Sequence, residues 1–447
     1  MDTSTHQNTP QARKDPDARF RGQRNLRKKR VGIVTMGVKL GDETRGYTRF
    51  RFLSELLVKQ GFEVELFTSS FQHWEKAQRD TTRACYQNQP YRITFIPEPG
   101  YQKNLDLARI KSHRIAAKNL RDMLQKRFDE DPRAFDLLYA EIPPNDVARV
   151  CAEEARRYGI PFVADINDLW PEAMRMVVNI PVLSDIAFYP FTRDARKVYQ
   201  LLSAAVGTSD EYAARPAADR TEPYPHITVY VGNDLASFDA GVAQNADAVE
   251  KPADEVWVAY AGTLGASYDL STLIKAGAEL HTRREAQLSQ SSSRITPPIR
   301  IKILGDGPDR TKLEELATQL SAPVDFLGYQ NYPSMAAWLS KSDIVVNSLV
   351  KSAAQSIVTK IGDYLASRSA LVNTGSSPEF RAKVESDGFG VNVEAEQVAP
   401  LADALEELAR NSSLRKIMAA RGRRIAEEEF DQPRSYLEIV RLIQTLA

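Results

Sequence analysis

Short, largely apolar runs alternate with longer amphipathic stretches along most of the chain. In the first half such runs occupy 31–36, 62–67, 91–96, 135–140, 160–165, 204–208 and 227–231, and helical periodicity is clearest at 104–128 and 145–158. Apolar runs of this length are typical of strands that are buried on both faces of a parallel sheet. The pattern predicts an α/β domain in which helices cover both faces of one parallel sheet.

A second series of the same kind follows. It predicts strands at 256–261, 299–304, 343–348 and 369–373 and helices at 268–280, 309–321 and 357–367. Between the two series, residues 236–254 lose periodicity and are rich in Ala, Asp and Asn, which indicates a linker. Residues 281–298 are typical of a mobile surface excursion. We therefore expect two Rossmann-like halves with a ligand cleft between them.

The composition excludes several classes of protein. Lysine plus arginine equal aspartate plus glutamate at 59 each. The chain therefore has no net positive charge of the kind that would indicate a nucleic-acid partner. The two cysteines, Cys85 and Cys151, form no CxxC motif, which favours a reduced setting. No apolar run approaches the roughly 20 residues of a membrane span, and the N-terminus lacks the apolar stretch of a signal peptide. We expect a cytoplasmic protein.

Residues 1–30 differ from the rest of the chain. They carry nine Lys or Arg against three acidic residues and contain few apolar ones, which predicts a disordered basic tail. The end of the tail, 27–30, suits the anionic inner face of a plasma membrane, at about 1 kcal/mol per charge. A solvated leader that aids solubility explains the same run equally well. Peripheral membrane contact through this tail is therefore one of two open interpretations.

Loops at the carboxyl ends of the second series of strands are candidate ligand-binding elements, because ligands of open parallel sheets bind there. Ala261–Gly265 follows one strand and Leu304–Pro308 follows the next. Their glycines allow backbone N–H groups to approach a phosphate. Tight turns after strands also require glycine, so neither loop is diagnostic alone.

The segment after the third of these strands carries more chemistry. A helix that starts at Ile357 would direct its free N–H groups, with the hydroxyls of Ser356 and Thr359, towards a diphosphate. Lys360 would add a point charge. Asp363 would accept hydrogen bonds from the two hydroxyls of a ribose, each contributing roughly 1.5–3 kcal/mol. Taken alone, Lys360 and Asp363 are better explained as a surface ion pair at i, i+3.

Several motifs follow one another in order along the chain. Asp165–Pro171 reads DINDLWP, Val231–Asp234 reads VGND with Phe238 behind it, and Lys360–Ala366 reads KIGDYLA. Together with Gly41–Gly61 and the glycine loops, they resemble a retaining glycosyltransferase of the GT-B fold, family 4 (group 1), of the bacterial capsule, exopolysaccharide and O-antigen type. Each motif is weak alone, and their order over nearly the whole folded chain carries the resemblance.

The resemblance implies an α/β GT-B fold, with two Rossmann-like domains facing across a cleft. Residues 31–235 would bind the acceptor, 236–254 would link the domains, 255–430 would bind the nucleotide sugar, and 431–447 would form a helix that packs back on the first domain. The implied activity moves a sugar from an NDP-sugar, which we expect to be a UDP-sugar, to a glycan or lipid-linked acceptor in surface polysaccharide biosynthesis. No cofactor and no metal ion are expected.

The resemblance also assigns roles to matched positions. Lys360, Asp168 and Gln355 are the expected catalytic residues, with Asp168 positioning or deprotonating the acceptor unless it only caps the helix that starts near Pro171. Lys360 and Asp363 would face the donor, with Asp363 at the second acidic place of the family's E-x7-E motif. The other implied donor-binding residues are Gly262, Thr263, Leu264, Gly305, Tyr329, Ser356, Ile357, Val358 and Thr359. The loop that faces the acceptor and the diphosphate contains Gly41, Arg45 and Gly46.

The chain also departs from the family pattern at positions that are important for the activity. Gln355 replaces the first acid of E-x7-E, and Thr263 stands where the family often has Arg. Much of the cationic clamp on the leaving diphosphate is therefore missing, and Lys360 and Arg45 would have to replace it. This loss keeps another function open, a non-catalytic partner that binds a nucleotide sugar. A GT-B-fold epimerase is a separate alternative, and its own motifs are not apparent in the sequence.

Other candidate residues have simpler explanations. Asp129–Asp131 matches a metal-binding D-x-D pattern but lies at a helix end before Pro132, where solvated acids are common. The five histidines lack the spacing of zinc ligands. His73 and Trp74, after the second strand, either pack in the core or line the acceptor site.

Overall fold

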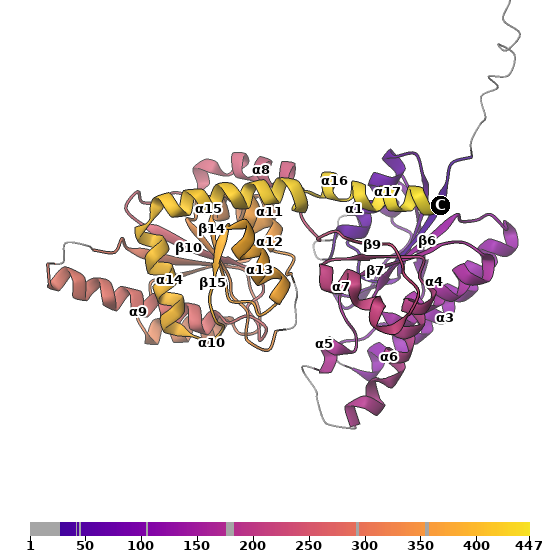
Figure 1. Cartoon of the computed structure of the whole chain (residues 1–447), viewed down its shortest axis with the longest axis horizontal. Coiled ribbons are helices and arrows are strands. Elements are labelled where there is room, and N and C mark those ends of the chain that lie inside the picture. Colours follow the sequence, from indigo (N-terminus) through magenta and orange to yellow (C-terminus); the bar gives the residue numbers. More distant parts are fainter. Residues whose placement is uncertain are drawn as a thin grey trace, which may run out of the picture.

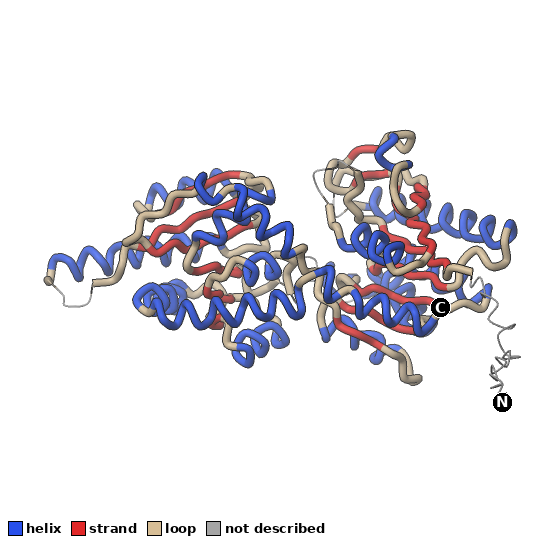
Figure 2. Tube along the Cα trace, turned by 90° about the horizontal axis from the view of Figure 1, so that it is seen from above, coloured by secondary structure: helices blue, strands red, loops and turns tan. Residues whose placement is uncertain are grey.

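The chain folds into two α/β domains that stand side by side (Figure 1). The computed structural model describes residues 27–41, 43, 46–103, 106–175, 183–291, 295–353 and 357–447. Each domain contains one parallel sheet, and helices flank the strands in both (Figure 2). None of the described helices combines the length and the apolar character that a membrane crossing requires.

The first domain is built on a seven-stranded parallel sheet in the order β5-β2-β1-β6-β7-β8-β9. Its elements are β1 (Arg30–Thr35), α1 (Arg49–Lys59), β2 (Glu63–Ser69), β3 (Phe71–Gln72), β4 (Ala77–Gln78), α2 (Ala84–Gln87), β5 (Arg92–Ile96), α3 (Leu107–Glu130), β6 (Leu137–Ile142), α4 (Asn145–Tyr158), β7 (Phe162–Ile166), α5 (Glu172–Arg175), α6 (Leu183–Leu201), β8 (Ala204–Gly207), α7 (Asp210–Ala214) and β9 (His226–Thr228). Every residue of β6 and β7 is buried. Burial on both faces is the reason why these strands are continuous apolar runs.

The second domain has a six-stranded parallel sheet in the order β12-β11-β10-β13-β14-β15. Its elements are α8 (Leu235–Gln244), β10 (Val256–Ala261), α9 (Leu270–Ser289), β11 (Ile299–Leu304), α10 (Arg310–Gln319), β12 (Val324–Gly328), α11 (Tyr332–Lys341), β13 (Ile344–Asn347), α12 (Ile361–Ala366), β14 (Ala370–Asn373), α13 (Pro378–Asp387), β15 (Gly390–Asn392), α14 (Val398–Arg410) and α15 (Ser412–Ile425). The central strand β10 is buried at all its positions. The carboxyl-terminal ends of strands from both sheets face the space between the domains. The loops after these strands therefore lie between the domains.

The interdomain segment differs from its predicted form. Composition predicts a linker at 236–254, but α8 occupies the first half of this range and packs against α11. Phe238 is completely buried, and Asp234 caps the helix by accepting hydrogen bonds from the amides of Ala236 and Ser237. Only a few small and apolar residues face the second domain, so the helical periodicity is too weak to be recognised in the sequence.

The C-terminal helices cross back to the first domain (yellow in Figure 1). After α15 come a short π-helical stretch (Ala426–Phe430), α16 (Gln432–Ser435) and α17 (Leu437–Leu446). Tyr436, Ile439, Val440 and Ile443 pack into the first domain's core against β1 and α1. The chain therefore passes twice between the domains, and its last helix is an integral part of the first one.

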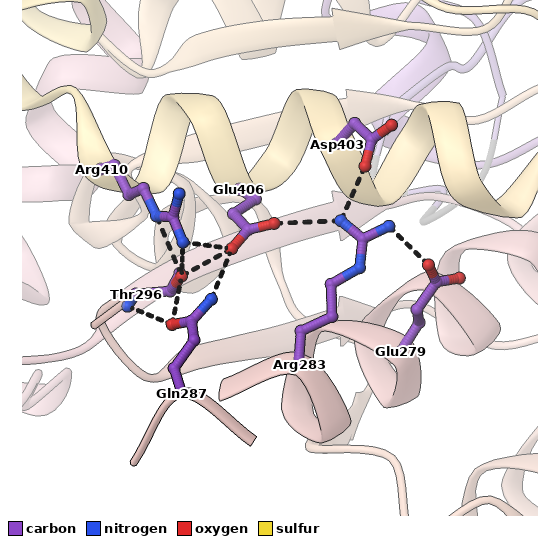
Figure 3. Close-up of polar contacts among 7 residues, drawn as sticks. All are labelled: Glu279, Arg283, Gln287, Thr296, Asp403, Glu406 and Arg410. Carbon is purple, nitrogen blue, oxygen red and sulfur yellow. Dashed lines mark hydrogen bonds and ion pairs between the residues drawn. The ribbon is translucent and has the colours of Figure 1, made fainter. Parts of the chain in front are cut away.

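Polar contacts order a region that the sequence suggests is mobile. Helix α9 continues to Ser289, well into the predicted excursion at 281–298, and Figure 3 shows how its end is fastened to α14. Nη1 of Arg283 lies 2.7 Å from Asp403 Oδ1 and 3.0 Å from Glu406 Oε2. Glu406 also accepts a hydrogen bond from Thr296 Oγ1 at 2.7 Å. The prediction was wrong because the stabilising partners lie on a helix distant in sequence.

The described end of the basic tail contacts the protein itself. Nη2 of Arg27 lies 2.6 Å from Asp136 Oδ1, and Nζ of Lys29 lies 2.6 Å from the backbone oxygen of Ala447. Arg30 pairs with acids of α3 and β2. These positive charges are partly compensated by the first domain, which leaves less charge for a membrane surface. Residues 1–26 of the predicted tail lie outside the described part of the chain.

Candidate active site

A cleft of about 700 Å³ lies between the two domains. Its first-domain wall follows the ends of β1, β6 and β7, and its second-domain wall follows the ends of β10 and β13. Ligands of open parallel sheets bind beyond the carboxyl ends of the strands. The cleft is therefore at the position where both sheets would bind a ligand.

The cleft brings together only some of the predicted residues. Asp168 lines it from the first domain, and Ile357, Val358 and Thr359 line it from the second. The three predicted residues Arg45, Gln355 and Ser356 lie outside the described part of the chain. The remaining predicted residues do not line the cleft.

The helix predicted at 357–367 is shorter in the structure. Helix α12 begins at Ile361, and turns precede it from Ile357 to Lys360. Three successive β-branched residues, at 357–359, disfavour the helical conformation because their χ1 angles are restricted. The residues that line the cleft here therefore belong to a turn and not to the first turn of a long helix.

Lys360 points inward, against the loop after β10. Although the residue as a whole is half-buried, its Nζ is fully buried and has no hydrogen-bond partner among the described residues. Nζ lies 4.1 Å and 4.0 Å from the ring centroids of Tyr260 and Tyr268. A Cβ added to Gly262 would lie 2.6 Å from Nζ. Burial lowers the pKa of the Lys360 amine well below its ordinary value, so the amine is held close to the glycine loop in a site that disfavours its charge.

Asp363 faces the interdomain segment and does not line the cleft. Its Oδ1 accepts hydrogen bonds from Asn233 Nδ2 at 2.7 Å and from Tyr332 OH at 2.8 Å. Burial raises the pKa of Asp363 to about 6. Within the described part of the chain Asp363 and Lys360 form no ion pair with each other, because they point to different neighbours. The surface pair that the sequence favoured is not present.

The glycine loops after β10 and β11 pack against each other. A Cβ on Gly305, whose φ is +130°, would lie 1.8 Å from the carbonyl oxygen of Gly262. A Cβ on Gly307 would lie 2.2 Å from the carbonyl oxygen of Leu264. The close contact between the two loop backbones therefore requires these glycines. This structural requirement holds whether or not the glycines also contact a ligand. Thr263 is exposed at the tip of the first loop.

Three more predicted residues lie outside the cleft lining. Gly41 adopts a positive φ of +52° and lies against Cys85, while Gly46 lies against Trp74. Tyr329, expected near the base, is 71% exposed at the end of β12. None of the three contributes to the cavity wall.

Three carboxylates, those of Glu98, Glu141 and Asp168, line the first-domain side of the cleft. Asp168 accepts hydrogen bonds from the amide of Leu169 at 2.9 Å and from Trp170 Nε1 at 3.1 Å, and burial raises its pKa. Glu141, at the end of β6, accepts hydrogen bonds from Thr35 Oγ1 at 2.5 Å and from the amide of Met36 at 3.2 Å. Burial raises the pKa of Glu141 to about 7. Motif matching missed Glu141, although a charged residue within an apolar strand is itself a signal.

The other acid of the DINDLWP motif has a structural role. Asp165 is completely buried, and its Oδ2 lies 2.9 Å from Arg49 Nε and 2.6 Å from the hydroxyl of Tyr139. Asp168 is therefore the acid of this motif that faces the cleft.

The far end of the first-domain wall is aromatic and basic. It is lined by His73, Trp74, Tyr101, Arg109, His113 and Trp170. His73 and Trp74 both line the cleft. Aromatic walls with a few polar groups are typical of sites for small molecules.

The D-x-D segment lies at the end of α3. Asp129 and Glu130 end α3, and Asp131 follows it and pairs with Arg30. Among the described residues, no group of three or more His, Cys, Asp or Glu side chains could hold a metal ion.

Residues 258–411 match the family model described as glycosyl transferases group 1. The matched range begins in β10 and ends just after α14, so it covers most of the second domain. The second domain is therefore similar to the group 1 glycosyltransferases over this range. No curated protein has a sequence that matches it.

Solved structures resemble this chain over nearly its whole length. Sucrose-phosphate synthase from Thermosynechococcus elongatus has 14% identity and a TM-score of 0.66, with 94% of this chain and 99% of that chain covered. HepE from Anabaena, in complex with UDP, has 15% identity and a TM-score of 0.65, with 94% and 100% covered. WaaG, a glycosyltransferase involved in lipopolysaccharide biosynthesis, has 13% identity and a TM-score of 0.59, with 92% and 99% covered. The likeness confirms the predicted GT-B fold.

Proposed function

We propose that this chain is a glycosyltransferase that moves a sugar from a UDP-sugar to a glycan or lipid-linked acceptor, with retention of the anomeric configuration. The observation that carries the proposal is the interdomain cleft, which the group 1 domain bounds on one side and the carboxylates Glu141 and Asp168 bound on the other. HepE, of the same fold, has been solved with UDP and with UDP-glucose, which supports a uridine donor. The retention and the role in surface polysaccharide biosynthesis rest on the sequence resemblance.

The second-domain wall would hold the leaving diphosphate. Among the described residues that line the cleft from this domain, none carries a formal charge. Backbone amides of the turn at 357–359, whose residues line the cleft, are the donors that we expect to contact the diphosphate. Fixed donors stabilise developing negative charge more strongly in a site from which water is excluded. Lys360, next to Gly262, is the cation that we expect to complete this arrangement.

The first-domain wall would hold the acceptor. Glu141 and Asp168 are placed to accept a hydrogen bond from the acceptor hydroxyl, and a carboxylate with a pKa near 7 can take up its proton at neutral pH. Closure of the two domains would align that hydroxyl with the anomeric carbon and exclude water. No protein nucleophile is required in this proposal.

Incubation with a panel of UDP-sugars and glycan acceptors tests the function. We expect release of UDP that depends on the acceptor, and the anomeric coupling constant in the NMR spectrum of the product should match that of the donor. The reaction is run in EDTA, because we expect no metal requirement. An inverted product would contradict retention, and loss of turnover in EDTA would contradict metal independence. No turnover with any donor and acceptor would contradict the proposed function.

UDP binding should take up a proton at Lys360. Burial lowers the pKa of the amine in the free protein, and a bound diphosphate should raise it towards the ordinary 10.5. Between these two values the complex holds one more proton than the free protein, so UDP affinity should fall as the pH rises through this range. Calorimetry in buffers of different ionisation enthalpy measures the proton uptake.

A pair of variants isolates the contribution of Lys360. Lys360→Met should remove the proton uptake and weaken UDP binding by about tenfold, the equivalent of one charge-assisted hydrogen bond. Lys351→Met, at an exposed position of the same region, should change neither quantity. Proton uptake that persists in Lys360→Met would assign it to another group.

A further inference from the structure

Six side chains form one basic aromatic cluster at the far end of the first-domain wall. They come from four separate elements, the loops after β3, β5 and β7 and the first turns of α3. Its members are His73, Lys76, Tyr101, Arg109, His113 and Trp170. All except Lys76 line the cleft, so the cluster is part of the same cavity as Glu141 and Asp168.

Aromatic rings fix the guanidinium group of Arg109 at this end of the cleft. Its Cζ lies 4.8 Å from the centroid of the Trp170 ring and 5.3 Å from that of the Tyr101 ring. One turn later on α3, His113 stacks on Trp170 with a centroid distance of 6.3 Å and an interplanar angle of 15°. Since Trp170 also donates its indole N–H to Asp168, Arg109 is held in a defined position relative to the carboxylate that we assign to the acceptor.

The second cation of the cluster, Lys76, also contacts Tyr101. Nζ of Lys76 lies 4.7 Å from the Tyr101 ring centroid and 3.4 Å from His73 Nδ1. His73 Nδ1 in turn lies 2.6 Å from the hydroxyl of Tyr101. Two cations and two imidazoles thus lie around a single phenol ring.

The charges in the cluster repel one another. Burial, with Arg109 as the next cause, lowers the pKa of His113 to about 3 and that of His73 to about 4. The same two causes lower the pKa of Lys76. Both imidazoles are therefore neutral at physiological pH, and the positive charge is concentrated on Arg109 and Lys76.

Two carboxylates face the cluster, and both are already engaged. Glu98 is buried and accepts hydrogen bonds from the hydroxyls of Ser69 and Ser112, and burial raises its pKa. Asp168 is bonded to the Trp170 indole and to the amide of Leu169. The donors to these carboxylates are neutral groups, and Arg109 and Lys76 are the positive charges that would attract a further anion at this end of the cleft.

We propose that the basic aromatic cluster selects an acceptor sugar that carries a negative charge, either a phosphate ester or a carboxylate, and that Arg109 binds this anion. The planar fork of a guanidinium group matches phosphate and carboxylate oxygens bidentately. The aromatic side chains Tyr101 and Trp170 supply the apolar surface of the pocket. Arg109 is then a specificity-determining residue, and this inference rests on the proposed function of the cleft.

Matched monosaccharides test the selection. Glucose 6-phosphate, glucuronate and glucose share one ring and differ in charge, and their affinities are measured by NMR titration of the UDP-saturated enzyme. We expect at least one anionic sugar to bind about tenfold more tightly than glucose, the equivalent of one good ionic contact. The phosphate and carboxylate probes distinguish the two sources of the charge. Equal affinity of all three sugars, or no measurable binding of any, would overturn the proposal.

Variants of α3 identify the residue responsible. Arg109→Gln should bring the affinities of the anionic sugars to within about twofold of glucose, and Arg109→Lys should restore part of the preference because it keeps the charge. Arg114→Gln, at an exposed position of the same helix, should keep the full preference. An equal loss of affinity for glucose and for the anionic sugars in Arg109→Gln would show a merely structural role. UDP binding by every variant, measured in parallel, separates a failure of this inference from a failure of the proposed function.

Discussion

Replacing Arg49 with methionine should lower the free energy of unfolding by about 3–5 kcal/mol, because the change leaves the Asp165 carboxylate buried without its charge partner. Nε and Nη2 of Arg49 lie 2.9 Å and 3.1 Å from the two carboxylate oxygens. The side chains of Arg49 and Asp165 are only 2% and 0% exposed. A carboxylate in such a site cannot recover its lost contacts from water.

The same guanidinium group joins three parts of the chain. Nη1 of Arg49 donates to the carbonyl oxygens of Val229 and Tyr230, at 3.1 Å and 3.3 Å, and lies 3.2 Å from the hydroxyl of Tyr436. These residues belong to the interdomain segment and to the start of the C-terminal helix. We therefore expect the variant to loosen α17 together with the core of the first domain, which faster hydrogen exchange in α17 would reveal.

Urea denaturation followed by circular dichroism measures the loss of stability. Arg51→Met is the matched control, since Arg51 lies on the same helix and its Nε is 3.6 Å from Glu55 on a partly exposed face. An exposed pair of this kind contributes little, so the control should change the free energy of unfolding by less than about 1 kcal/mol. Equal losses in the two variants would contradict the buried ion pair as the cause.

Replacing Glu141 with glutamine should lower kcat by about 100-fold or more, the usual contribution of a general base. Glutamine keeps the size of the side chain, and its amide oxygen can still accept the hydrogen bonds from Thr35 and Met36. The variant loses the ability to take up a proton from the acceptor hydroxyl. We therefore expect UDP affinity to change little while turnover falls, and a parallel loss of UDP affinity would contradict this role.

The pH dependence of the reaction provides a second test of Glu141. Burial raises its pKa to about 7, and only the ionised carboxylate can accept a proton. The wild-type kcat/KM should therefore rise with pH, with a midpoint at about 7, and this inflection should disappear in Glu141→Gln. Glu154→Gln is the control, because Glu154 is buried on α4, 3.3 Å from Arg121, and does not line the cleft. It should retain the wild-type profile.

The strands could be predicted wherever both faces of the sheet are covered. Strands β10 and β11 have the predicted bounds, 256–261 and 299–304, because complete burial imposes a continuous apolar run. The edge strands β12 and β15 are only half-buried along their length, so their sequences carry no such run and were not predicted. Helix α8 was not predicted for a related reason, since only a narrow part of its surface is buried.

Some residues of the candidate site could likewise be predicted from the sequence, and others could not. Motif matching found Asp168 and the turn at 357–359, because loops after parallel strands lie at the cleft in any doubly wound sheet. It did not find Arg109 or its contact with Trp170, since these residues are brought together only when α3 packs beside the loop after β7. Lys360 was assigned to the diphosphate, but the direction of its side chain depends on Tyr260 and Tyr268, which belong to another strand and loop.

By itself the sequence determined the two parallel sheets and the loops at their carboxyl ends, because strand burial leaves a local pattern in the order of residues. Only the tertiary structure decided which side chains face the cleft and which charges meet there, because these depend on contacts between residues far apart along the chain.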